Sequence, residues 1–242
     1  MRKLGLSLVV ASSVAFAGGV IDPKPVIPVV PPVEVEKSDI VISANMTMAS
    51  KYIWRGVDQN NKGVAIQGGI DLEYKGFYLG TWASNVDYGV GSTDNIELDV
   101  YGGYRGEISG IGFDIGYIAY FLPNTYVDLD STAKEAYLGL SKDIGDFNIG
   151  TTLSYDFDAI NEDGDDGSYN IQFDASVKTI YDITLSSNFG ISDRVSTDDY
   201  YFLVGANKTV GKFDLGIAYT GYYSDALDDT TSHVVATIST SF

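Results

Sequence analysis

Acidic side chains recur at every second position in several parts of the sequence, as in Asp71 with Glu73 and Glu97 with Asp99. Side chains two residues apart point to the same face of a β-strand, so each pair would place two carboxylates on one side of a sheet. A row of carboxylates attracts cations and repels anions. The acidic residues on the polar face of the strands predicted below are Asp71, Glu73, Glu97, Asp99, Asp114, Glu135, Asp156, Asp174, Asp182 and Asp214.

The chain offers little material for other chemistry. It has no cysteine, which excludes disulfides, thiolate metal sites and thiol nucleophiles. A hydrolase would need a serine paired with the only histidine, His233, and no motif surrounds the nearby Ser232 and Ser239. The balance of 15 basic against 33 acidic residues gives a net charge of −18, which argues against binding to nucleic acid. We therefore expect no catalytic site, no cofactor and no dedicated metal site.

The acidic segment 156–167 has the composition of a calcium-binding loop, but Ile160 stands where a ligand is required. A solvated loop is the simpler interpretation. Divalent cations held loosely in such loops, beside anionic lipopolysaccharide, are the alternative.

The first 38 residues differ in composition from the rest of the chain. Residues 1–17 have the basic start, apolar centre and small-residue end of a secretory signal peptide. Residues 18–38 carry five of the six prolines, which favour an extended chain and cannot continue a sheet, so they predict a periplasmic tether. No later stretch is apolar over the 18 or more residues that a membrane-spanning helix needs.

From residue 39 to residue 242, hydrophobic and polar side chains alternate with a period of two, which predicts β-strands. Ile149, Leu153 and Tyr155 fall on one face of such a strand, and Thr152 and Ser154 fall on the other. The pattern predicts twelve strands, at 40–52, 63–74, 77–86, 95–105, 111–121, 134–142, 146–157, 168–178, 180–191, 199–208, 212–223 and 231–242.

The connections between these segments are alternately short and long, which is typical of an outer-membrane β-barrel with periplasmic turns and extracellular loops. Lipid offers no hydrogen-bond partner to an open sheet edge, so the sheet must close. The terminal Phe242 completes an amphipathic last strand, the signal that the outer-membrane assembly machinery recognises. A soluble sandwich or lipocalin-like barrel is the alternative. The predicted lipid-facing residues include Ile66, Leu98, Ile115, Leu138, Ile149, Phe173, Leu185, Val204, Ile217 and Ala236.

If the apolar face meets lipid, the acidic face lines the lumen, with Lys51, Arg105 and Lys178 as its basic residues. Barrels of eight strands are filled by side chains and barrels of sixteen enclose an aqueous channel, so twelve strands predict a narrow lumen. An excess of carboxylates there would favour cations. Alternatively, the carboxylates pair with the few bases and with tyrosine hydroxyls and obstruct the interior.

Several segments resemble the TorF family of porins. The resemblance spans residues 43–242 and is strongest over 50–104, where it includes Ser50-Lys51-Tyr52-Ile53-Trp54-Arg55-Gly56. The Pro-rich tether departs from the family pattern. The resemblance implies an outer-membrane barrel for passive solute passage. Its motif residues are Tyr52, Arg55, Gly56, Gln67, Gly68, Gly69, Trp82, Ser84 and Asn85.

The sequence thus predicts an all-β, transmembrane, antiparallel barrel in the bacterial outer membrane. Its predicted function is passive diffusion of small hydrophilic solutes, with a preference for cations. A substrate-specific channel and a non-conducting structural or surface-interaction barrel are the alternatives, and an enzyme ranks last.

Overall fold

The structure is a computed structural model in which long strands close into a single barrel. It describes residues 40–61, 63–89, 95–123, 133–160, 166–193, 199–224 and 229–242. The predicted signal peptide, the predicted tether and residues 161–165 of the acidic segment lie outside these ranges. The strands are β1 (Val41–Ala49), β2 (Ile53–Trp54), β3 (Val57–Asp58), β4 (Ala65–Tyr74), β5 (Phe77–Asn85), β6 (Ile96–Ile108), β7 (Ile111–Phe121), β8 (Ala133–Ile144), β9 (Phe147–Ile160), β10 (Asp166–Lys178), β11 (Ile183–Ser192), β12 (Asp199–Val210), β13 (Phe213–Ser224) and β14 (Asp229–Ser241).

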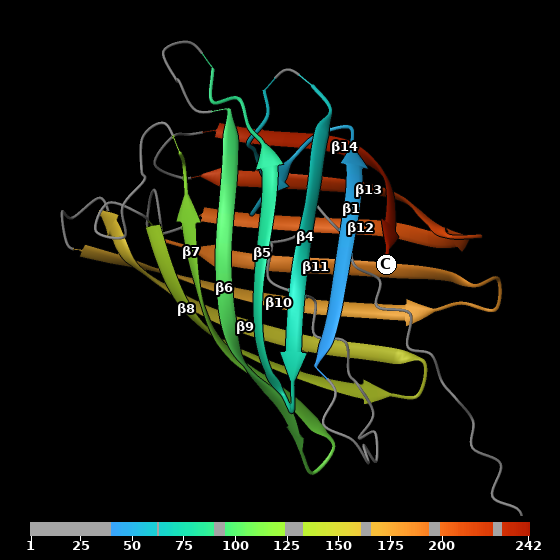
Figure 1. The fold of residues 1–242 in the computed structure, drawn as a ribbon. Helices are drawn as coiled ribbons and strands as arrows, with labels where there is room; N and C mark the ends of the chain where they lie inside the picture. Colours follow the sequence, from blue (N-terminus) through green and yellow to red (C-terminus); the bar gives the residue numbers. More distant parts are fainter. Residues whose placement is uncertain are drawn as a thin grey trace, which may run out of the picture.

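Twelve of these strands form the barrel wall, each antiparallel to both of its neighbours (Figure 1). The wall closes where β1 pairs with β14, with Met48 opposite Ile238. The remaining two strands, β2 and β3, pair only with each other. The prediction of an all-β, twelve-stranded antiparallel barrel is confirmed.

Short and long connections lie at opposite ends of the barrel, which we call the turn end and the loop end. The turn end holds the connections 75–76, 109–110, 145–146, 179–182 and 211–212, and the loop end holds the longer ones, beginning with 50–64. Lys75 and Gly76 both have positive φ, of 51° and 86°. Two consecutive positive φ values suit the right-handed twist of a hairpin and allow a two-residue turn.

One predicted strand begins too early. The prediction placed Asp182 inside a strand over 180–191 and therefore in the lumen, but β11 begins at Ile183 and Asp182 lies in the turn, with φ of 56°. The alternation fails here because two large side chains, Ile180 and Tyr181, are adjacent and both are exposed. The Asp182 side chain is 82% exposed and lies 3.4 Å from Lys178 Nζ, so this pair sits at the rim of the barrel.

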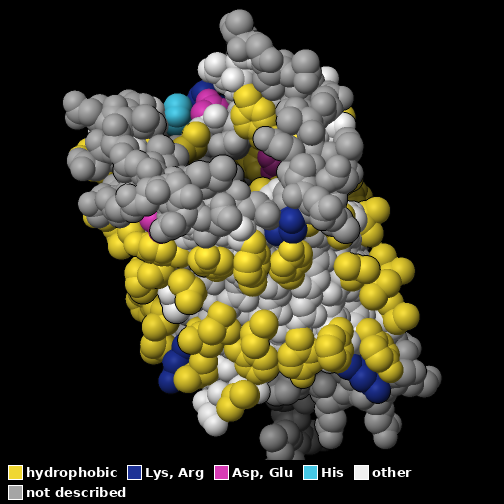
Figure 2. Space-filling view, turned by 90° about the vertical axis from the view of Figure 1, so that its left-hand side faces the viewer, with side chains coloured by type: hydrophobic (Ala, Val, Ile, Leu, Met, Phe, Trp, Pro, Cys, Tyr) yellow, Lys and Arg dark blue, Asp and Glu magenta, His cyan; other side chains and the backbone are white. Residues whose placement is uncertain are grey.

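The outer surface of the barrel carries a belt of exposed hydrophobic side chains, which gather in two bands on the face that Figure 2 shows, with Lys or Arg side chains at the margins. Water would destabilise so large an apolar surface, whereas lipid matches it. No helix among the described residues is long and apolar enough to cross a membrane. All of the predicted lipid-facing residues point outward and are exposed, namely Ile66, Leu98, Ile115, Leu138, Ile149, Phe173, Leu185, Val204, Ile217 and Ala236.

A lysine introduced at Leu153 should destabilise the barrel because Leu153 lies near mid-strand on the outer face of β9. We expect a loss of about 2–4 kcal/mol, the cost of a lysine near the bilayer midplane. Thr152 lies on the inner face of the same strand, so Thr152→Lys avoids contact with lipid and is the matched control. Denaturant titration in lipid measures both; equal losses would contradict the assignment of the two faces.

The chain ends at the turn end of β14, where Phe242 is exposed. Its backbone N–H donates to the Ala44 carbonyl at 2.9 Å, and its own carbonyl accepts from the Ala44 N–H at 3.2 Å. An exposed aromatic ring at this position suits a membrane interface. Deleting Phe242 should lower the amount of assembled barrel without reducing export, measured by fractionation and heat-modifiable migration. Unchanged assembly would count against a C-terminal assembly signal.

The inner face of the wall is polar in most places but not everywhere. Leu203, Ala218 and Val235 point inward from β12, β13 and β14 and are buried. They belong to one hydrophobic cluster with Ile53 and Tyr52, which come from the connection after β1. Part of the lumen is therefore filled by a packed apolar contact.

Candidate functional site

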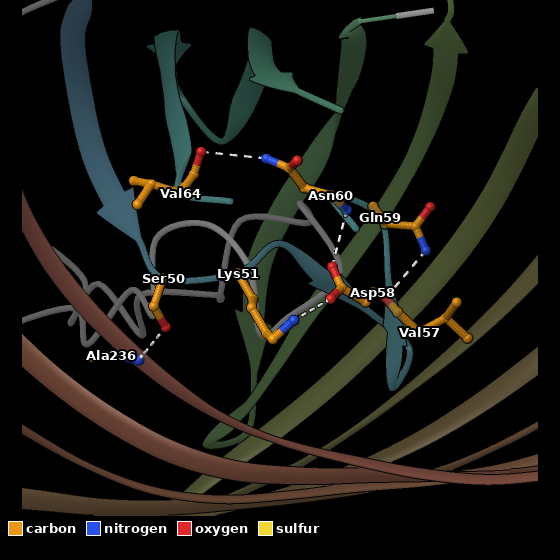
Figure 3. Close-up of polar contacts among 8 residues, drawn as sticks. All are labelled: Ser50, Lys51, Val57, Asp58, Gln59, Asn60, Val64 and Ala236. Atoms are coloured by element: carbon orange, nitrogen blue, oxygen red, sulfur yellow. Dashed lines mark hydrogen bonds and ion pairs between the residues drawn. The ribbon is translucent and has the colours of Figure 1, made fainter. Parts of the chain in front are cut away.

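The connection between β1 and β4 folds into the barrel instead of extending from it. Its residues 50–61, which we call the inward hairpin (Figure 3), contain β2 and β3. Trp54 pairs with Val57, so Arg55 and Gly56 form the tip. Arg55 has φ of 46° and Gly56 has φ of 82°, the same turn geometry as at the turn end of the barrel. The sequence predicted a strand over 40–52 and a long polar connection over 53–62, but β1 ends at Ala49 and the connection contains β2 and β3.

Hydrogen bonds within the inward hairpin hold its two arms together (Figure 3). Lys51 Nζ lies 2.5 Å from Asp58 Oδ2, and Asp58 Oδ1 accepts from the Asn60 N–H at 3.0 Å. The Gln59 N–H donates to the Tyr52 carbonyl at 2.7 Å. At the base, the Ser50 N–H donates to the Ala236 carbonyl of β14 at 2.9 Å. These contacts make the hairpin an ordered unit attached to the wall.

The tip of the inward hairpin reaches two separate parts of the wall. Arg55 Nη2 donates to Glu135 Oε2 of β8 at 2.7 Å, and the two side chains are only 5% and 0% exposed. On the other side, a Cβ atom at Gly56 would lie 2.8 Å from the Cβ atoms of both Tyr201 and Tyr222. Only glycine fits this approach, so the hairpin bridges β8 and the β12–β13 wall.

A second contact joins the inward hairpin to β5 and β6. Tyr52 Oη donates to Glu97 Oε1 at 2.7 Å, and Tyr88 Oη donates to Glu97 Oε2 at 3.1 Å. The Tyr52 ring meets the Trp82 ring edge to face, with centroids 5.4 Å apart. Burial, followed by the negative charges of Glu97 and Asp99, raises the pKa of Tyr52 well above 10. Tyr52 therefore stays a neutral hydroxyl donor.

A layer of tyrosines crosses the β5–β8 side of the lumen nearer the turn end. Tyr78 Oη donates to Asp114 Oδ1 at 2.6 Å and also contacts the Tyr137 hydroxyl. Tyr101 Oη donates to Asp71 Oδ1 at 2.6 Å. This layer and the inward hairpin narrow the lumen at two depths.

Carboxylates outnumber bases among the buried side chains of the described residues, with six acidic residues against one basic residue, Arg55. Arg105 Nη2 lies 2.7 Å from Glu73 Oε2, and its guanidinium carbon lies 4.8 Å from the centre of the Tyr78 ring. Asp71, Glu97 and Asp114 accept hydrogen bonds from tyrosine hydroxyls, which stabilise a carboxylate without removing its charge. The lumen thus keeps an acidic excess in the described part of the chain.

The other predicted lumen residues fall at different depths. Asp99 on β6 and Asp156 on β9 are buried on the inner face of the barrel. Asp174 is half-buried and accepts from Gln172 Nε2 at 2.9 Å. Asp214 accepts from Thr209 Oγ1 at 2.5 Å near the turn end, where Lys178 is also placed.

The residues of the TorF-like motif lie in the inward hairpin and on the neighbouring strands β4 and β5. Asn85 Oδ1 accepts from the Ile66 N–H at 2.6 Å and Asn85 Nδ2 donates to the Val64 carbonyl at 3.1 Å, which fixes the start of β4. Gln67 and Ser84 are opposite each other on β4 and β5 and are buried. Gly68 and Gly69 lie close to the β1 and β5 backbones. Sequence reasoning counted Arg55 as a loop residue and so missed the buried pair with Glu135.

His233 forms no hydrogen bond with Ser232 or Ser239 in the described chain. It points inward from β14 opposite Thr220, whereas Ser232 is exposed on the outer face. Ser239 lies six residues further along the same strand, roughly 20 Å away at the rise of a β-strand. Neither serine can share a hydrogen bond with His233.

The family model described as "Bacterial protein of unknown function (Gcw_chp)" matches residues 34–241. The chain belongs to this family. The match of the Gcw_chp model covers the whole barrel and begins within the Pro-rich segment. No curated protein matches the chain.

Among solved structures, this Gcw_chp barrel resembles the KdgM porin, with a TM-score of 0.54 and 11% identity over 83% of this chain and 99% of that one. It resembles the NanC porin with a TM-score of 0.53 and 13% identity over 84% and 99% of the two chains. A further match is the KdgM porin in complex with disordered oligogalacturonate, with a TM-score of 0.53 and 11% identity over 83% and 98% of the two chains. At these identities the likeness concerns the fold.

Proposed function

We propose that this protein is a TorF-type porin of the bacterial outer membrane, which passes small hydrophilic solutes through a narrow, cation-preferring lumen. The observation that carries the proposal is a closed barrel with an apolar outer belt and an acidic interior. In the proposed orientation in the outer membrane, the turn end faces the periplasm and the loop end faces outward, beside lipopolysaccharide.

The charge of the lumen supports a solute class different from that of the KdgM complex. Oligogalacturonate, named in that complex, is a polyanion. Here the buried side chains of the described residues include six carboxylates, among them Glu97, Asp99 and Asp114, and one base, Arg55. Such a lumen repels a polyanion and concentrates cations. Neutral and cationic solutes are therefore the proposed cargo.

Two other functions remain candidates because of specific contacts. The inward hairpin and the tyrosine layer narrow the lumen, which favours a substrate-specific channel over a general one. The packed cluster of Ile53 with Leu203 and Val235 favours a non-conducting barrel.

Recordings in planar bilayers separate these functions. The refolded full-length mature chain should give discrete conductance steps in KCl, and the reversal potential across a KCl gradient should have the sign of a cation-preferring pore. Anion preference would overturn the proposed selectivity. Protein that is folded by circular dichroism but gives no steps would support the non-conducting barrel.

A further inference from the structure

The turn between β10 and β11 exposes two large side chains at the turn end of the barrel. Ile180 is 91% exposed and Tyr181 is 70% exposed. Hydrogen bonds fix the backbone beneath them, because the Asp182 N–H donates to the Thr179 carbonyl at 3.1 Å and the Thr179 N–H donates to the Ile183 carbonyl at 2.8 Å. Water destabilises such an exposed pair, whereas the interface of a bilayer suits both an aliphatic side chain and a tyrosine.

Two lysines lie close to this turn. Lys208 on β12 is opposite Ile183 of β11 and Leu215 of β13, and it belongs to the outward phase of its strand, as Val204 does. Lys212 lies in the turn after β12, and both lysines are exposed. Neither forms an ion pair in the described part of the chain. A lysine beside apolar residues can lay its stem along them and hold its ammonium group at the membrane surface.

The carboxylates of this region point elsewhere or are already paired. Asp174, Asp199 and Asp214 lie in the inward phase of β10, β12 and β13. Asp182 lies in the turn, 3.4 Å from Lys178 Nζ. The outer rim therefore carries two positive charges that no described carboxylate neutralises, and such charges attract anionic lipid head groups.

We propose that Ile180, Tyr181, Lys208 and Lys212, which we call the rim patch, bind an anionic phospholipid of the periplasmic leaflet. The lysines bind its phosphate, and its acyl chains lie along the hydrophobic belt, which includes the exposed Leu215 (Figure 2). A free phosphate ion would make the ionic contact but not the apolar one. The inference goes beyond solute passage and rests on the proposed orientation in the outer membrane.

The test places a fluorophore in the rim patch. The variant Tyr181→Trp of the full-length mature chain is refolded in phosphatidylcholine bilayers that contain brominated phosphatidylglycerol or brominated phosphatidylcholine. Bromine quenches tryptophan on contact, and the native Trp54 and Trp82 lie inside the barrel, away from lipid. At equal mole fraction, brominated phosphatidylglycerol should quench the introduced tryptophan more strongly.

The lysines should account for this preference. Adding Lys208→Gln and Lys212→Gln should lower the relative affinity for phosphatidylglycerol by roughly tenfold or more, whereas Lys208→Arg with Lys212→Arg should retain it. The matched control, Lys75→Gln with Lys142→Gln, removes the same charge from the turn end outside the rim patch. It should leave the preference unchanged. An equal loss in this control would assign the effect to the charge of the whole rim and overturn the site.

A tryptophan at mid-barrel separates failure of the site from failure of the proposed function. Leu153→Trp, on the outer face of β9, should be quenched by both lipids because the belt lies in the bilayer. If only the Tyr181→Trp fluorophore escapes quenching, or if both lipids quench it equally, the rim patch is overturned and the membrane barrel stands. If Leu153→Trp also escapes quenching, the membrane function itself is overturned. A preference that inorganic phosphate abolishes at constant ionic strength would overturn a lipid as the ligand.

Discussion

Arg55→Glu should release the inward hairpin and increase single-channel conductance. Arg55 and Glu135 form a buried ion pair at 2.7 Å, and the substitution would place two carboxylates in contact there. Breaking a buried pair costs about 3–5 kcal/mol. Gly56, the other residue of the tip, packs closely against β12 and β13, so displacement of the tip would leave a wider bore. We expect conductance to rise by roughly twofold or more, because bore width limits ion flow in a barrel of this size.

The double variant Arg55→Glu with Glu135→Arg is the matched control. It restores opposite charges at the same two positions and should bring conductance back toward the wild-type value. Circular dichroism and heat-modifiable migration establish that each barrel is folded before recording. If a folded Arg55→Glu barrel conducts as the wild type does, the pair does not hold the constriction.

The barrel wall was predictable because its determinants are local. A period of two assigns each side chain to the lipid or to the lumen, so Ile149 and Thr152 on β9 were placed on the correct faces from the sequence. Strand ends were less accurate where the alternation is broken, as at Ile180 and Tyr181. Asp182 was assigned to the lumen for that reason.

The inward hairpin was not predictable in the same way, because distant residues fix its position. Tyr52 and Glu97 are 45 positions apart, and Arg55 and Glu135 are 80 positions apart. Composition alone makes residues 53–62 look like a polar loop. The available signal was the pair Arg55-Gly56, a two-residue turn flanked by the hydrophobic Ile53, Trp54 and Val57.

The contacts of the arginines and tyrosines also bear on the acidic residues that face the lumen. The sequence left two outcomes open, a charged lumen or one obstructed by pairing with bases and tyrosines. Contacts of both kinds occur in the described lumen: Glu73 and Glu135 pair with arginines, and Asp71 and Asp114 accept hydrogen bonds from tyrosine hydroxyls. A tyrosine hydroxyl can narrow the lumen without neutralising the carboxylate that it binds, so the proposed cation preference is compatible with a constriction.

Neutralising Glu97, Asp99 and Asp174 together should reduce cation preference. Glu97 and Asp99 are buried on β6, and Asp174 is half-buried on β10. Charges inside a narrow, low-dielectric wall act on passing ions more strongly than exposed charges do.

The triple variant Glu97→Gln, Asp99→Asn and Asp174→Asn should therefore lower the cation-to-anion permeability ratio, roughly severalfold at low salt and less at high salt, where screening is stronger. The control triple variant Asp143→Asn, Asp146→Asn and Asp182→Asn removes the same charge from exposed positions at the turn end and should change selectivity little. Reversal potentials across a KCl gradient measure both. Equal shifts in the two triple variants would mean that net charge, and not the position of carboxylates in the lumen, sets the selectivity.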